Sequence, residues 1–292
     1  MLRLPGGERV YDHQDPLLQV APTNWSPDGS QLLVDQFDWG ASAPTAANGL
    51  YAWDARTGAM RPAASGIARA IHGNWLPQGD GLVFQGLCDE GRPAVYALPL
   101  ATMSARVVAL DAMVVDGECV RPADNGQYKI FFRRSGRDDP EVAGVWVTVA
   151  RGAQERRLLP IDGSRQVRWS VSPDGSMLAA ACSKVGKGAQ VLLHDCSSGA
   201  EVTRTAADDR LWRPVWSPDG RSVLCVGRSS LWVLDVNSRG LAERSTDLPP
   251  SDSEAVCAWS RAAARVLVAR GAAVWLLDPS SGHASKLCDL AQ

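Results

Sequence analysis

The apolar positions of the chain fall in short runs, or alternate with polar ones, and show no helical spacing. Clusters of Gly, Pro, Ser, Asp and Asn separate these runs. One cluster, Ser-Pro-Asp-Gly, lies between a tryptophan and an apolar run at 25–34, and it returns at 216–226. The pattern predicts β-strands joined by tight turns along the whole chain.

This turn recurs with a regular period, which is the mark of a repeat architecture. Successive copies lie 43 to 51 residues apart and align on Pro27, Pro77, Pro122, Pro173, Pro218 and, where the proline is lost, Arg261. A second landmark follows each copy, an apolar strand that runs into another polar turn, as in "LYAWDARTG" and "VWLLDPSSG". Two such landmarks per period predict four short strands per repeat.

The chemistry of the first turn supports a sharp reversal. Proline presets φ near −65°, aspartate hydrogen-bonds nearby backbone, and glycine adopts positive φ without steric cost. The chain has 11 tryptophans, and eight of them lie at the two landmarks: Trp25, Trp53, Trp75, Trp146, Trp216, Trp232, Trp259 and Trp275. We expect these rings to pack between neighbouring sheets.

Four-stranded units with this period predict an all-β fold, a β-propeller of six four-stranded blades, with seven as the alternative. We expect a single domain over 1–292. The approximate repeats are 19–68, 69–112, 113–165, 166–208, 209–251 and 252–292. Residues 1–18 are expected to add an outer strand, and pairing of a terminal strand into the blade at the opposite terminus is expected to close the ring.

Composition narrows the classes of partner. The formal net charge is −2, and basic residues are scattered, which disfavours nucleic acid and anionic membrane surfaces as partners. The seven cysteines form no Cys-x-x-Cys pair and mostly lie in apolar runs, so we expect small buried thiols in a reducing compartment. The N-terminal segment resembles no secretory signal, and a cytoplasmic location is expected.

The motif "WSPDG" before an apolar strand resembles the repeat of TolB-type propellers, which also occurs in the propeller domains of prolyl-oligopeptidase-like enzymes. The resemblance covers nearly the whole chain and implies the fold, but not one function. The hydrolase domain of those peptidases does not fit within this length, and no Gly-x-Ser-x-Gly nucleophile motif is present. Peptidase activity is therefore not implied.

Recognition is expected on the irregular face of the blades. The two turn motifs lie on one face of a blade, and the longest connections, at 36–49, 85–94, 133–144 and 183–189, lie on the other. Aromatic residues and arginines dominate interface energetics, and the binding candidates are Phe37, Trp39, Arg133, Arg134, Arg137 and Trp212. Alternatively, the aromatic residues fold back over their own blade and the charged run is a solvated loop.

Polar residues just before the turn motifs are expected at the mouth of the central channel: Asn24, His72, Asn74, Asp116, Glu118, Arg168, Trp212, Arg213 and Glu254. Four of them are candidates for catalysis, namely His72, Glu118, Arg168 and Arg213, because a general base and a charge-stabilising arginine suffice for proton transfer. The alternative is that they solvate the channel. The two arginines oppose a cation, so we expect no metal and no cofactor.

These observations favour a non-catalytic binding or scaffold propeller that recognises a protein partner through its loop-rich face. The alternative is an enzyme at the polar channel mouth, such as a lyase, isomerase or hydrolase of a small polar metabolite, or a protein that binds such a ligand. We therefore expect a protein partner or a small polar ligand. The oligomeric state is left open.

Overall fold

The structure is a computed structural model. It describes residues 2–3, 9–11, 18–38, 49–114, 120–123, 127–136, 139–149, 155–161, 165–184, 189–207, 211, 214–228, 230–251, 255–259 and 264–289. The chain divides into two compact units, Met1–Arg156 and Arg157–Gln292. Each unit is described below by itself.

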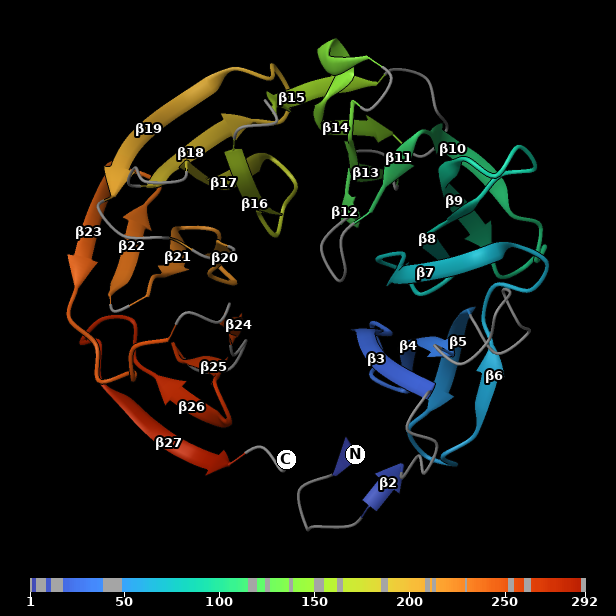
Figure 1. Cartoon of the computed structure of the whole chain (residues 1–292), viewed down its shortest axis with the longest axis horizontal. Helices are drawn as coiled ribbons and strands as arrows, with labels where there is room; N and C mark the ends of the chain where they lie inside the picture. Colours follow the sequence, from blue (N-terminus) through green and yellow to red (C-terminus); the bar gives the residue numbers. More distant parts are fainter. Residues whose placement is uncertain are drawn as a thin grey trace. The chain divides into compact units, whose positions relative to one another are not determined.

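The first unit begins with two four-stranded antiparallel sheets, whose strands are labelled in Figure 1. Within each sheet the strands lie in chain order, and every neighbouring pair is antiparallel. The strands are β3 (Leu18–Trp25), β4 (Gln31–Asp38), β5 (Gly49–Asp54) and β6 (Met60–Pro62), then β7 (Ala68–Trp75), β8 (Gly81–Leu87), β9 (Pro93–Pro99) and β10 (Arg106–Leu110).

The third sheet departs from this regularity at its inner strand. Its strands are β11 (Ala112–Met113), β12 (Val120–Pro122), β13 (Tyr128–Arg134), β14 (Gly144–Val149) and β15 (Arg156–Pro160). The order is β11-β13-β14-β15, and β12 also pairs with β13. The two short strands pair with opposite ends of β13, so together they take the place of one inner strand.

The second unit contains three more four-stranded antiparallel sheets, again in chain order. Their strands are β16 (Arg165–Val171), β17 (Met177–Lys184), β18 (Ala189–Asp195), β19 (Glu201–Ala207), β20 (Val215–Trp216), β21 (Ser222–Val226), β22 (Leu231–Asp235), β23 (Gly240–Arg244), β24 (Val256–Trp259), β25 (Val266–Arg270), β26 (Ala273–Leu277) and β27 (Ala284–Asp289). Six antiparallel blades, the third with its inner strand divided in two, confirm the predicted all-β propeller class. None of the described segments forms a helix long and apolar enough to cross a membrane.

The chain ends differ from the expectation. Strands β1 (Leu2–Arg3) and β2 (Arg9–Tyr11) pair with each other as a two-stranded sheet. The last sheet draws its four described strands from β24 to β27, so it already has an outer strand of its own. The predicted extra outer strand is therefore a separate short hairpin in the described part of residues 1–18.

The Ser-Pro-Asp-Gly turn is held by side-chain hydrogen bonds, as its sequence predicts. The Ser26 hydroxyl donates to Asp28 Oδ1 (2.6 Å), and the N–H of Gln31 donates to Ser26 Oγ (2.9 Å). The same serine–aspartate bond recurs at Asp174 and Asp219. The Ser26 hydroxyl, followed by the N–H and hydroxyl of the next serine, lowers the pKa of Asp28 to about 2.

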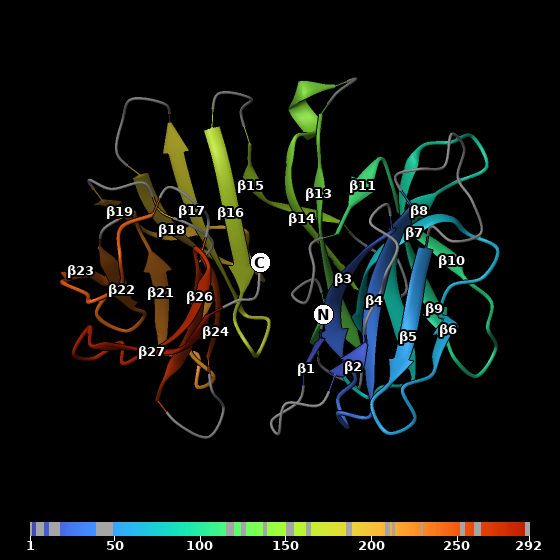
Figure 2. The same cartoon turned by 60° about the horizontal axis from the view of Figure 1, so that its bottom comes forward.

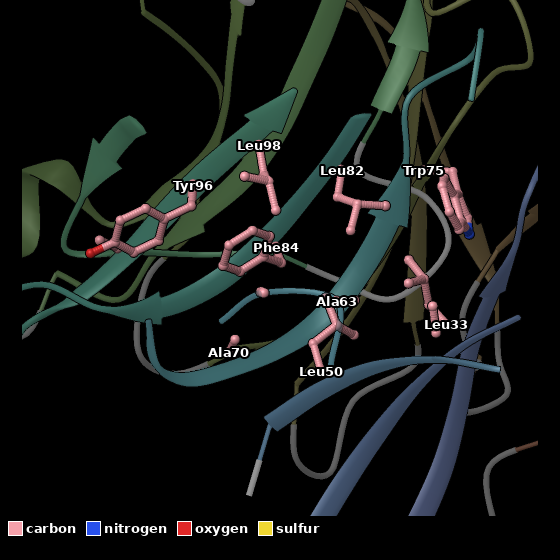
Figure 3. Packing of buried hydrophobic residues seen from close by; sticks show 12 residues of the cluster. Leu33, Leu50, Ala63, Ala70, Trp75, Leu82, Phe84, Tyr96 and Leu98 are labelled. Carbon is pink, nitrogen blue, oxygen red and sulfur yellow. The ribbon is translucent and has the colours of Figure 1, made fainter. Parts of the chain in front are cut away.

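A buried cluster joins the first two sheets (Figure 3). Leu33 and Leu50 from the first sheet lie with Trp75, Phe84 and Tyr96 from the second. The Phe84 and Tyr96 rings stack with their centroids 5.6 Å apart. Alternating residues of β4, β5, β8 and β9 supply this cluster, so the period-two pattern of the sequence fixes which side chains meet.

Tryptophans of the inner strands connect neighbouring sheets in the second unit. Trp216 Nε1 donates to the carbonyl of Ser170 (3.2 Å), and Trp259 Nε1 donates to that of Val215 (3.1 Å). The acceptors occupy equivalent positions in the two preceding sheets. Each comes directly before the residue that precedes the Ser-Pro-Asp-Gly turn. The predicted packing between sheets is therefore confirmed for these two rings, and each also satisfies its N–H there. Trp25 differs from the prediction, because it is 45% exposed and its ring centroid lies 6.1 Å from that of Trp53 in its own sheet.

Candidate functional site

The loop-rich face of the first unit contains a short connection between β8 and β9. The N–H of Cys88 donates to the carbonyl of Arg92 (2.9 Å), and the N–H of Gly91 donates to that of Cys88 (2.8 Å). Arg92 Nη1 lies 2.7 Å from Asp111 Oδ2, at the connection to the third sheet. This carboxylate raises the pKa of Arg92. Backbone bonds and an ion pair thus fix this connection.

The connection between β13 and β14 is longer and extends beyond the ends of both strands (Figure 2). It contains the 3₁₀ helix η2 (Pro140–Val142). The Asp139 carboxylate caps the helix by accepting the N–H of Glu141 (2.9 Å). At the other end, Trp146 Nε1 donates to the carbonyl of Val142 (2.9 Å). The described part of the loop is therefore ordered by its own contacts.

The Arg134 side chain stabilises the base of this loop through several contacts. Its guanidinium carbon lies 5.2 Å from the centroid of the Phe132 ring and 4.9 Å from that of Trp146. Its two terminal nitrogens lie 2.7 and 3.0 Å from the carboxylate oxygens of Glu155, and Nε donates to the Leu110 carbonyl at 3.4 Å. Cation–π contacts and a bidentate ion pair thus hold one side chain that is only 16% exposed.

Three binding candidates lie in strands, not in loops as the sequence suggested. Arg133 and Arg134 belong to β13, where they pair with Val145 and Gly144. Phe37 belongs to β4, opposite Gln19. Both β13 and β4 continue past their own apolar runs, because their partner strands also pair with the polar residues that follow. Arg133 Nε is buried and makes no hydrogen bond within the described part of the chain.

A second polar cluster joins the first two sheets. Asp35 on β4 is 1% exposed, and both its carboxylate oxygens accept the backbone N–H of His72 on β7 at 2.9 Å. His72 Nδ1 lies 3.4 Å from Asp35 Oδ2, and the His72 side chain is 34% exposed. Buried Asn74 donates from Nδ2 to the His72 carbonyl (3.0 Å). The structure therefore brings two of the predicted residues, His72 and Asn74, together.

The cluster combines backbone strain with polar burial. His72 has φ of +55°, a conformation that side chains with a Cβ adopt rarely, and the Asp35 carboxylate holds it there. A buried carboxylate beside a partly exposed imidazole is also an arrangement that orients a general base. Sequence reasoning missed Asp35. Its signal was an acidic residue inside the apolar strand "LLVDQF".

The remaining candidates are spread along the chain. Asn24 is half-buried on β3, opposite Leu33. Arg168 is exposed on β16 of the second unit, opposite Ala181. Seven candidates lie outside the described residues: Trp39, Asp116, Glu118, Arg137, Trp212, Arg213 and Glu254. The convergence of the four catalytic candidates stays a prediction.

Neither metal ligands nor reactive thiols gather in the described part of the chain. No group of three or more His, Cys, Asp or Glu side chains there could hold a metal ion. The six cysteines it includes are free thiols. Burial raises the pKa of Cys225 to about 12 and that of Cys257 to about 12, which makes both thiols poor nucleophiles.

Comparison with solved structures shows the same fold. TolB from Acinetobacter baumannii aligns over 85% of this chain and 58% of its own, at 20% identity and a TM-score of 0.52. A putative TolB from Agrobacterium tumefaciens aligns over 96% and 83%, at 20% identity and a TM-score of 0.55. The chain thus spans less than two thirds of the length of the first of these proteins. No protein-family profile and no curated protein sequence matches it.

An enzyme also shares the fold. Oligogalacturonate lyase from Vibrio parahaemolyticus aligns over 85% of this chain and 87% of its own, at 12% identity and a TM-score of 0.53. At these identities the likeness establishes the TolB-type propeller fold and nothing finer.

Proposed function

We propose that the chain is a protein-binding module that recognises its partner through the loop-rich face of its blades, with the loop 135–143 as a principal contact. The observation that carries this proposal is the construction of that loop. It extends beyond β13 and β14 (Figure 2), and a capped helix and the Arg134–Trp146 stack order its described part.

A loop that is ordered before its partner binds favours tight recognition. A loop that is already fixed loses less conformational entropy when a partner docks, so more of the contact energy appears as affinity. Asp139, Pro140 and Glu141 are exposed at the end of this loop. The segment 137–141 carries three acidic residues and one arginine. We therefore expect a basic patch on the partner's surface.

Charge reversal in the loop tests the proposal. Partners captured by cross-linking to the wild-type chain are identified, purified and titrated against variants by calorimetry. Glu141→Lys is expected to raise the dissociation constant at least about tenfold, because it opposes the partner's charge. Arg56→Glu, in a turn on the opposite face of the first blade, is the matched control and is expected to bind as wild type.

The proposal fails if Glu141→Lys binds as tightly as wild type while Arg56→Glu does not. That result would place recognition on the regular face of the blades. Arg134→Ala is expected to weaken binding as well, through release of the loop. Circular dichroism of each variant confirms that the sheets are retained.

The Asp35–His72 pair favours a second candidate, an enzyme or binding protein for a small polar ligand. A buried carboxylate that orients a partly exposed imidazole supplies a general base. One neighbour in fold is an oligogalacturonate lyase, which suggests oligogalacturonate as the probe. The test follows the ultraviolet absorbance of unsaturated uronate product, with wild type beside His72→Ala. Product formation that His72→Ala abolishes supports this function, and its absence with wild type rejects it for this substrate.

A further inference from the structure

The outer strand of the second blade, β10, has an exposed edge. Within the described residues it pairs only with β9, and it forms the outer end of the sheet order β10-β9-β8-β7 (Figure 1). The Leu110 carbonyl at the end of β10 accepts Arg134 Nε at 3.4 Å, and the remaining backbone groups that point away from β9 present a template for another strand. The edge ends at Leu110 and Asp111, whose carbonyl and carboxylate contact Arg134 and Arg92 of the loop-rich face. The inference nevertheless does not depend on the proposed function, because it requires no contact between a partner and the loop that joins β13 to β14.

The sequence of β10 sets it apart from the other outer strands. After Arg106 it contains only Val107, Val108, Ala109 and Leu110. The outer strands of the other sheets all carry charge or proline beyond their first residue: "MRP", "RRLLP", "EVTRTAA", "GLAER" and "ASKLCD". Charges and prolines are the usual protection of a sheet edge against pairing with another chain. The interior of β10 lacks both.

A bulge in β10 gathers its exposed apolar side chains on one face. Val107 lies opposite Tyr96 and Leu110 lies opposite Ala94, with the register shift between Val107 and Ala109. Tyr96 and Ala94 are two residues apart on β9, so they share a face, and their partners on β10 share it too. Val107 is 45% exposed and Leu110 is 38% exposed. Without the bulge these two side chains would lie on opposite faces.

We propose that β10 pairs antiparallel with β10 of a second copy of this chain. The segment Arg106–Asp111, with the sequence RVVALD, is complementary to itself in that direction. A twofold axis between Val108 and Ala109 sets Val107 opposite Leu110 of the other copy and Arg106 opposite Asp111. Apolar residues then meet apolar ones, and opposite charges meet at both ends. The contact is isologous, which is the commonest form of homodimer interface.

The size of this contact sets the expected strength. The shared segment has only six residues, and the bulge interrupts its ladder. Both charged ends already have partners in their own chain, since Asp111 lies 2.7 Å from Arg92 and Arg106 hydrogen-bonds Tyr128. A contact of this length buries less than the roughly 1,200 Å² of standard stable interfaces. The dimer is therefore weak and forms at high micromolar concentration and above.

Sedimentation velocity over a rising concentration series tests the proposal, with four variants of the full chain. Arg106→Asp and Asp111→Arg each set like charges opposite each other and are expected to abolish the dimer. The double variant carries both changes, restores complementarity and is expected to restore dimerisation. Val107→Lys removes the apolar pairing and is expected to give a monomer without changing a charge at the segment ends.

The matched control is Leu287→Lys on β27, an outer strand of the sixth sheet, where the leucine is 53% exposed. It is expected to dimerise as wild type. Hydrogen exchange adds a local readout, since the amides of β10 should gain protection as concentration rises. Four results overturn the proposal: a wild-type monomer at the highest concentration, a dimer that Val107→Lys retains, a dimer that Leu287→Lys abolishes, or protection acquired only with an added foreign peptide.

Discussion

At the scale of single residues, the second turn of a blade has one residue in the left-handed conformation wherever the structure describes that turn. In the turn after β5, the N–H of Gly58 donates to the carbonyl of Asp54 (2.9 Å), and Gly58 has φ of +72°. Arg239 occupies the corresponding position after β22 with φ of +59°. A side chain with a Cβ costs about 1–2 kcal/mol in this conformation, because the Cβ approaches a carbonyl oxygen.

Arg239→Gly is therefore expected to raise the free energy of unfolding by about 1 kcal/mol, since relief of this strain exceeds the added freedom of glycine in the unfolded chain. Gly58→Ala should lower it by about the same amount, and no atom lies within 4 Å of the added Cβ to complicate the result. Urea denaturation measures both changes. A destabilising Arg239→Gly or a neutral Gly58→Ala would contradict the argument.

The site shows at this scale what a sequence cannot reveal. The Arg-rich run at the end of β13 was visible in the sequence, but the contacts of Arg134 depend on Trp146 and Glu155, which follow it by 12 and 21 residues. Asp35 on the first sheet accepts a hydrogen bond from His72 on the second sheet. Local chemistry predicts a turn because all its groups lie within a few residues. Contacts between sheets depend on register and packing, which only the folded structure supplies.

At the scale of strands and sheets, close approach of the first two blades requires glycine at position 73. A Cβ added to Gly73 on β7 would lie 2.6 Å from Leu50 Cδ1 and 2.9 Å from Leu33 Cδ1. Both leucines are buried in the cluster that joins the two sheets (Figure 3). The backbone of β7 therefore packs directly on the side chains of the neighbouring sheet, with no room for a methyl group.

Gly73→Ala is expected to lower the free energy of unfolding by about 1–3 kcal/mol, the usual cost of overpacking. Leu50→Ala alone creates a cavity and should cost about 2–5 kcal/mol. The double variant should cost less than the sum, because the space left by one change accommodates the other. Gly49→Ala, whose added Cβ lies 4.0 Å from the Tyr51 ring, is the control. Strict additivity of the two changes would count against the close contact.

The strands themselves follow the sequence pattern closely where both landmarks are intact. The turn motifs at Pro27, Pro173 and Pro218 each separate two paired strands. Prediction was weakest where the motif is degenerate, as before Pro122, where the inner strand is divided between β11 and β12. The chain start also differed, because β1 and β2 pair with each other as a two-stranded sheet. Edge pairing has no local sequence signal, so periodicity alone could not assign it.

At the scale of the whole molecule, repeated turns give the chain a common response to acid. In several described turns, hydrogen bonds from neighbouring N–H or hydroxyl groups lower the pKa of an aspartate, among them Asp28, Asp54, Asp195, Asp219, Asp235 and Asp278. The pKa of Asp195, lowered first by the Ser197 hydroxyl, is about 2, against an ordinary value of 3.8. Both units contain such turns, so acid acts on blades along the whole chain.

The direction of the effect follows from proton linkage. A carboxylate whose pKa is lower in the folded chain than in the unfolded chain stabilises the fold fully above the unfolded value. Stability is then lost as the pH falls from about 4 towards the folded value near 2. We expect the thermal midpoint to fall steeply in this range, and to fall less in the double variant Asp28→Asn, Asp195→Asn. Asp89→Asn, in the β8–β9 connection, is the control and should follow wild type. An identical acid profile for all three proteins would show that the turn carboxylates do not carry this dependence.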